Sequence, residues 1–175
     1  RRIKSFFKSC INGVFPIQSS DKKIDTFFNN AIKRKNFKAS SDIKEYSTAD
    51  IVIVDINLDV QKNKRDKALD NFYSVDLSNF RKAITIIAEN CKNDVLLLVE
   101  TTVPPGTCKN IIKPIFEKIF DKRKIEHKFK IGHSYERVMP GPNYIDSIKN
   151  YYRVYSGINS ESADAVEEFL KTIIS

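Results

Sequence analysis

Apolar and polar residues alternate in blocks along the chain, and these blocks predict strands and helices in turn. The densest block is residues 95–99, an aliphatic run followed by Glu100, two threonines, two prolines and a glycine. A run of this length is typical of a strand buried on both faces. Proline has no N–H to donate to a neighbouring strand, so this strand must end before Pro104. Thr101 and Thr102 then lie at its carboxyl end.

Other segments predict further extended structure. Residues 49–56 repeat the buried-strand pattern and are rich in β-branched side chains, which favour strands. Residues 129–133 and 153–157 predict two shorter strands, and residues 37–40 a weak one. Residues 57–71 carry many charges and little apolar material, and this predicts a long exposed loop.

Between the strands, apolar residues recur at the three-and-four spacing of amphipathic helices. Asp21 is a good N-cap for one of them, and its apolar stripe predicts core packing. The expected helices are residues 1–12, 21–32, 78–88, 107–121 and 160–173, with a short helical or turn segment at 42–47. Alternating strands and helices predict an α/β fold with a doubly wound, Rossmann-like parallel sheet.

Composition narrows the class of protein. The chain has 175 residues and a net charge of +8. The lysines and arginines are scattered beside predicted helix ends and loops, and no nucleic-acid-binding module is present. A solvated basic surface, with some attraction for a phosphate-bearing small molecule, is therefore favoured over a nucleic-acid partner. No apolar run has the length of a membrane span, so no membrane partner is expected.

The three cysteines, Cys10, Cys91 and Cys108, and the two histidines show no metal-ligand spacing. We therefore expect neither a metal site nor a disulfide framework, and a reducing, cytoplasmic location fits best. The chain does not begin with Met, which suggests that it starts inside a longer protein.

Two loops at the ends of predicted strands contain residues that could carry chemistry, namely residues 100–106 and 134–141. The carboxyl ends of parallel strands form the edge of the sheet where ligands bind in open α/β folds. A Thr-Thr pair alone often has only a structural role at a strand end. Its neighbours decide between the two interpretations.

At these loops the chain resembles the nucleotide-sugar dehydrogenases, the UDP-glucose and UDP-N-acetylhexosamine 6-dehydrogenases. That family carries Ser-Thr or Thr-Thr followed by Val-Pro-Pro-Gly-Thr, which residues 101–107 match. It also carries a Ser-Pro-Glu-Arg stretch, often continued as Val-Met-Pro-Gly, which residues 134–141 match with Tyr135 in place of proline. The resemblance extends over nearly the whole chain.

The resemblance implies an enzyme that oxidises the C6 alcohol of a UDP-sugar to a carboxylate in two hydride transfers, each to NAD, and that forms a homo-oligomer. It implies catalytic roles for Thr102, beside the cofactor and a catalytic water, and for Glu136, at the reacting centre. Thr101 and Asn57, together with those two residues, are the expected cofactor contacts. Arg137 is the expected substrate contact. The alternative for Glu136 is an ordinary ion pair with a neighbouring arginine.

The chain also departs from the family. Leu58 replaces the threonine of the family's cofactor loop, and Tyr135 replaces the proline before Glu136. The Tyr-Glu-Arg-Val-Met-Pro-Gly form resembles the branch associated with surface-polysaccharide precursors. This favours a UDP-N-acetylhexosamine over UDP-glucose.

Two parts of the family's chemistry have no match in the sequence. There is no Gly-x-Gly-x-x-Gly, the turn that holds the dinucleotide phosphates. The three cysteines do not match the family's nucleophile, which lies in a later domain. We therefore expect residues 1–175 to be a partial NAD-binding domain, without the first strand, the glycine-rich turn and the C-terminal substrate domains. Alone, it should be inactive and either marginally stable or associated. The alternative is a non-catalytic Rossmann-like nucleotide-binding or interaction module.

Overall fold

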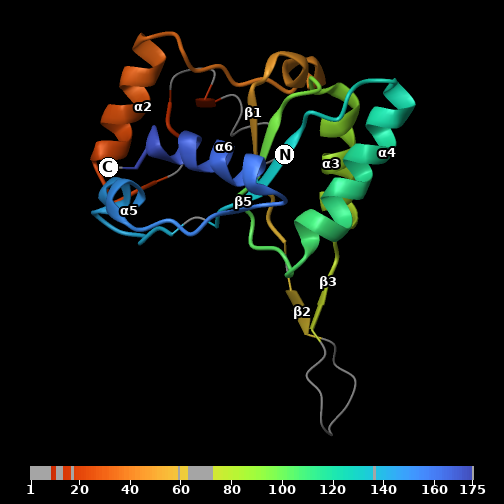
Figure 1. The fold of residues 1–175 in the computed structure, drawn as a ribbon. Helices are drawn as coiled ribbons and strands as arrows, with labels where there is room; N and C mark the ends of the chain where they lie inside the picture. Colours follow the sequence, from red (N-terminus) through yellow and green to blue (C-terminus); the bar gives the residue numbers. More distant parts are fainter. Residues whose placement is uncertain are drawn as a thin grey trace, which may run out of the picture. The chain divides into compact units, whose positions relative to one another are not determined.

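The computed structural model (Figure 1) describes residues 9–10, 14–16, 18–58, 60–62, 73–135 and 137–174. The chain forms two compact units. The larger unit comprises Ile43–Glu136 and Arg153–Thr172, and the smaller unit comprises Arg1–Asp42, Arg137–Tyr152 and Ile173–Ser175.

A four-stranded sheet with the order β1-β4-β5-β6 forms the centre of the larger unit. Its strands are β1 (Ile51–Val54), β4 (Leu96–Val99), β5 (Lys130–His133) and β6 (Ser156–Gly157). The first three are parallel, as predicted, whereas β6 runs antiparallel to β5. The prediction of a wholly parallel sheet was therefore wrong for the last strand, which is reached through the long segment after β5 and not through a crossover helix.

Helices cover both faces of this sheet (Figure 1). On one face α3 (Ser78–Asn90) packs against α4 (Lys113–Arg123), which continues directly from the π-helical segment η2 (Cys108–Ile112). On the other face α6 (Ser160–Lys171) packs against β4, β5 and β6. The predicted doubly wound arrangement is confirmed.

The core of the larger unit lies between the sheet and the α3–α4 layer. It consists of buried residues from the strands and helices: Val52, Val54, Val95, Leu97, Val99 and Ile131, with Phe80, Ile84, Ile87, Ala88, Ile112, Phe116 and Phe120. All of β4 is buried, as the aliphatic run predicted. In β1, by contrast, Ile53 is 47% exposed. The prediction that this strand is buried on both faces was wrong, because its side chains alternate between buried and less buried positions.

Several helix boundaries follow from local chemistry. The Asp76 carboxylate accepts a hydrogen bond from the Ser78 N–H at 2.8 Å, at the predicted start of α3. Pro114 lies in the first turn of α4, where the regular α-helix begins after η2. The cap of α6 is Asn159, whose side chain accepts a hydrogen bond from the Ser162 N–H.

Two predicted segments differ from the structure, and a third agrees with it. Residues 37–40 form no strand. The predicted loop at 57–71 instead contains β2 (Val60–Lys62), which pairs with β3 (Tyr73–Val75) in an antiparallel hairpin. The short helical segment was correctly predicted and is η1 (Ile43–Thr48). Local pattern does not identify the hairpin, since its pairing joins residues on either side of a polar stretch.

The smaller unit contains α2 (Lys23–Lys33) and α5 (Tyr144–Asn150), a helix that the sequence pattern did not predict. No residue of α2 is fully buried, and Phe27 is 53% exposed, so the predicted core stripe is only half covered. Phe28 contacts the rings of Phe15 and Phe37. In the described ranges, no helix is long and apolar enough to cross a bilayer.

Gly132 of β5 is predicted to be essential for the packing of α6. A Cβ at this position would lie 2.2 Å from Cγ2 of Val166 and 3.1 Å from the Ser156 carbonyl oxygen. Gly132→Ala should lower the free energy of unfolding by about 1–3 kcal/mol, measured by urea denaturation. Adding Val166→Ala should recover part of this loss, because it removes the clashing methyl group. Purely additive effects would contradict this account.

Candidate functional site

The carboxyl ends of β1 and β4 are joined by the side chain of Thr101. Its hydroxyl accepts a hydrogen bond from the Ile56 N–H at 2.6 Å and donates to the Val54 carbonyl at 3.2 Å. Two backbone N–H groups, those of Glu100 and Thr101, also donate to that carbonyl. Thr101 is only 7% exposed. The two threonines of the pair therefore differ in role, because the hydroxyl of Thr101 is hydrogen-bonded to the end of β1.

Thr102 and Asn57 follow these two strand ends on the same edge of the sheet, and both are exposed. A threonine hydroxyl at such an edge can donate and accept hydrogen bonds at once. The structure therefore brings together three of the predicted cofactor contacts, Thr101, Thr102 and Asn57. Their roles toward a ligand remain predictions, and the saturated hydroxyl of Thr101 makes Thr102 the better candidate of the pair.

β5 extends this edge on the other side of β4. The Ser134 N–H donates to the Val99 carbonyl at 3.0 Å, so pairing continues one residue beyond the end of β5. His133 Nε2 lies 3.3 Å from the Thr101 carbonyl oxygen and donates to it in the tautomer with a proton on Nε2. His133 therefore links β5 to the Thr-Thr turn, a role that its isolated position in the sequence did not indicate.

A cavity of about 410 Å³ lies beside this turn. The cavity is lined by the loop after β4, the end of β5 and the region of β6, that is by residues 103–109, 131–133 and 156–158. Its volume is in the range of small-molecule sites. The side chains of His133 and Lys109 give it a polar and basic side, while the two prolines and Ile131 give it an apolar side.

Two buried polar atoms near the end of β5 have no hydrogen-bond partner among the described residues, namely Ser134 Oγ and Arg153 Nε. Arg153 also donates from Nη1 to the Tyr135 carbonyl at 3.3 Å. Buried polar groups are normally paired, so such atoms often mark a site completed by a ligand or water. Of these two residues, Ser134 belongs to the segment 134–137 that matches the family motif in the sequence.

The residues that depart from the family motif have structural roles here. Tyr135 is 40% exposed, and its ring lies beside that of His133, with centroids 6.3 Å apart. Leu58 is partly buried and packs against the core of the larger unit. These contacts replace the proline and the threonine hydroxyl that the family carries at those positions.

The structure does not test the other two predicted site residues, Glu136 and Arg137. Glu136 lies outside the described residues. Arg137 belongs to the smaller unit, where it is exposed. The predicted catalytic role of Glu136 and substrate contact of Arg137 therefore stay predictions.

The cysteines have the properties of structural residues. Burial raises the pKa of the Cys108 thiol to about 11 and also raises the pKa of Cys91. Thiols with raised pKa values stay protonated at neutral pH and are poor nucleophiles. Among the described residues, no group of histidine, cysteine and acidic side chains has the arrangement of a metal site.

Comparison with known proteins decides the family. The model of the UDP-glucose/GDP-mannose dehydrogenase family, NAD binding domain, matches residues 8–174. The chain belongs to this family. It corresponds to the family's NAD-binding domain, an oxidoreductase domain with NAD as cofactor, and the expected family and cofactor are confirmed.

Curated relatives are nucleotide-sugar dehydrogenases. A UDP-N-acetyl-D-mannosamine dehydrogenase of Methanococcus maripaludis is 29% identical over 149 residues, covering 85% of this chain and 30% of the relative. A UDP-N-acetyl-D-glucosamine 6-dehydrogenase of Pseudomonas aeruginosa is 32% identical over 108 residues, covering 61% of this chain and 25% of the relative. The chain thus spans about a third or less of the length of these relatives.

Solved structures share the fold. The UDP-D-ManNAc dehydrogenase of Pyrococcus horikoshii superimposes with a TM-score of 0.81 at 20% identity, covering 98% of this chain and 37% of that one. An NDP-N-acetyl-D-galactosaminuronic acid dehydrogenase of Methanosarcina mazei gives a TM-score of 0.82 at 22% identity, over 98% and 34% of the two chains. The predicted Rossmann-like class is confirmed.

The described residues fit part of an NAD molecule. The edge formed by β1, β4 and β5 supplies the exposed Thr102 hydroxyl, the adjacent cavity and two unpaired polar groups, which suit ribose hydroxyls and an amide. The sequence contains no glycine-rich turn for the pyrophosphate. The expected contacts of this chain are therefore those at the strand ends.

Thr101 and Thr102 are predicted to differ in their effect on stability. Thr101→Val removes the acceptor of the partly buried Ile56 N–H, and should lower the free energy of unfolding by about 1–3 kcal/mol. Thr102→Val makes the same change at an exposed position, and should alter stability by less than about 0.5 kcal/mol. Urea denaturation of the two variants measures both effects. Equal losses would contradict the joining role of Thr101.

Proposed function

We propose that this chain is the cofactor-binding part of an NAD-dependent dehydrogenase that oxidises the C6 alcohol of a UDP-N-acetylhexosamine to the uronic acid. The family match over residues 8–174 carries this proposal. Relatives named for N-acetylmannosamine and N-acetylglucosamine derivatives support the choice of an N-acetylated sugar, and so does the Val-Met-Pro-Gly segment after Arg137.

Each residue at or after a strand end has its own role in this proposal. NAD, when bound, accepts the hydride from the sugar. Thr102 hydrogen-bonds the cofactor or orders a water beside it, and Asn57 and the backbone around Thr101 form the adjoining wall of the site. Glu136 takes part in proton transfer at the reacting group, a role that a carboxylate can fill. Arg137 binds the anionic UDP-sugar, since a guanidinium can bridge phosphate oxygens.

The proposal also assigns three properties of the family to the whole protein. A homo-oligomer, a cytoplasmic location and a role in surface-polysaccharide precursor synthesis are parts of it. The second candidate function is a non-catalytic nucleotide-binding module. One observation favours that candidate, namely that Leu58 packs against the core where the family carries a threonine.

NAD affinity tests the site directly. Thr102→Val should weaken NAD binding about tenfold, the loss expected for about one hydrogen bond, when titrated by calorimetry. Thr85→Val is the matched control, because the Thr85 hydroxyl donates to a helix carbonyl, that of Arg81, in α3. This control should bind NAD as the parent chain does.

The outcomes separate the two candidate functions. Binding of NAD together with UDP-N-acetylhexosamine supports the dehydrogenase. Binding of another nucleotide in preference to NAD favours the non-catalytic module. Equal NAD affinity of the parent chain and Thr102→Val would contradict the placement of the cofactor at the end of β4.

A further inference from the structure

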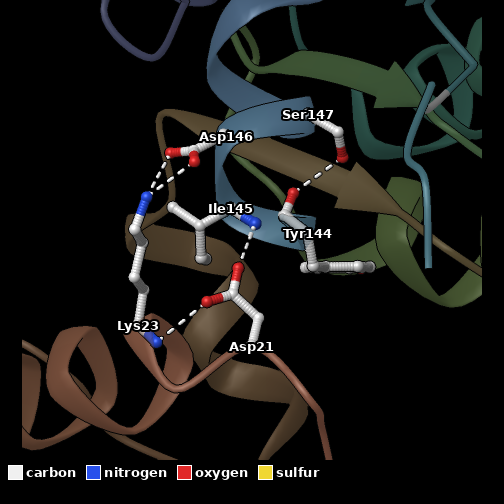
Figure 2. Close-up of polar contacts among 6 residues, drawn as sticks. All are labelled: Asp21, Lys23, Tyr144, Ile145, Asp146 and Ser147. Carbon is white, nitrogen blue, oxygen red and sulfur yellow. Dashed lines mark hydrogen bonds and ion pairs between the residues drawn. The ribbon is translucent and has the colours of Figure 1, made fainter. Parts of the chain in front are cut away.

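A buried carboxylate joins two segments of the smaller unit that are distant in sequence (Figure 2). Asp21 is 2% exposed. Its Oδ1 accepts a hydrogen bond from the Lys23 N–H at 2.9 Å, at the start of α2. Its Oδ2 accepts from the Ile145 N–H at 2.8 Å, in the first turn of α5 and 124 residues away. One side chain therefore caps both helices.

An ion pair lies beside this carboxylate. Lys23 Nζ contacts both carboxylate oxygens of Asp146 at 2.6–2.7 Å, so α2 and α5 meet at a second point (Figure 2). Both side chains are about half exposed, and an exposed pair contributes little by itself. The Asp21 carboxylate is the stronger of the two links, since it is buried and accepts from two partly buried N–H groups.

α5 in turn holds the loop that precedes it. Ser147 is 3% exposed, and its hydroxyl donates to the Tyr144 carbonyl at 2.7 Å and accepts from the Met139 N–H at 3.0 Å. The Tyr151 hydroxyl also approaches Met139 Sδ at 3.8 Å. The segment 137–141 is therefore fastened to α5, and α5 is fastened to α2 through Asp21.

Apolar burial around α5 is limited among the described residues, since Ser147 is its one fully buried residue. The helix has only seven residues, which is too short for independent stability in water. α2 buries none of its residues fully, so apolar packing contributes less here than in the sheet of the larger unit. The position of the segment 137–141 thus depends on polar links.

We propose that Asp21 and Ser147 are positioning residues that hold the segment carrying Arg137 in the conformation that binds the sugar nucleotide. The inference rests on the proposed function, because that function assigns Arg137 to the substrate. Neither residue touches the ligand in this proposal. Both act through the backbone of residues 137–145.

Two variants and a matched control test the proposal. Asp21→Ser keeps a short oxygen near the Lys23 N–H but cannot also reach Ile145. Ser147→Ala removes the acceptor of the Met139 N–H. Asp25→Ser makes the same change as the first variant at an exposed position in the first turn of α2. Amide exchange measured by NMR should accelerate about tenfold or more at Ile145 in the first variant and at Met139 in the second, with no change in the control.

Ligand affinity shows whether the hydrogen bonds of Asp21 and Ser147 affect binding of the sugar nucleotide. Both positioning variants should bind UDP-N-acetyl-D-mannosamine about tenfold more weakly than the parent chain, with NAD affinity unchanged. Unchanged amide exchange, or faster exchange with unchanged affinity for the sugar nucleotide, would overturn the proposal. A parent chain that binds NAD but no UDP-sugar would also overturn it. A parent chain that binds neither ligand would overturn the proposed function as well.

Low pH should weaken the hydrogen bond between the Asp21 carboxylate and the Ile145 N–H. The Ile145 N–H is the main cause that holds the pKa of Asp21 below its usual range, and the N–H and charge of Lys23 add to it. A carboxylate with a lowered pKa stabilises the fold above its unfolded pKa, and this contribution is lost as the pH falls through the folded pKa. Ile145 exchange, corrected for its intrinsic pH dependence, should therefore accelerate below about pH 4. Asp146→Asn removes the other carboxylate facing Lys23, and the acid effect should persist in it.

Discussion

The hydrogen bonds of the Thr101 hydroxyl are the constraint on which the rest of the candidate site depends. They join the carbonyl of Val54, the last paired residue of β1, and the Ile56 N–H beyond it to the chain just after β4. Without them, the Ile56 N–H would lose its acceptor, and only the backbone N–H groups of Glu100 and Thr101 would still join the two strand ends at Val54. With them, the loop that carries Asn57 and the turn that carries Thr102 leave the sheet from fixed points, and His133 adds a third link from β5.

The two units hold their loops by the same kind of interaction. In each, a buried side-chain oxygen accepts from a backbone N–H that is distant in sequence, Thr101 in the larger unit and Asp21 in the smaller one. Such a link loses little side-chain entropy and satisfies an N–H that burial would otherwise make costly. A site built on loops can be ordered in this way without a large apolar interface beneath it.

Local pattern predicted those elements whose burial is complete or whose ends carry strong signals. β4, α3 and the start of α4 follow from an aliphatic run, the Asp76 cap and Pro114. Pattern failed where partners decide the outcome. Residues 37–40 have strand-like composition but no strand to pair with, and the β2–β3 hairpin depends on pairing across a polar stretch.

The sequence by itself determined the α/β class, the position of the Thr-Thr turn at a strand end and the family resemblance, because these depend on short-range periodicity and on motif order. Only the tertiary structure distinguished the two threonines, one buried between strand ends and one exposed at the edge. It alone paired Asp21 with Ile145. The physical reason is that a hydrogen bond between distant residues depends on where the chain brings their backbones, and no local pattern encodes that distance.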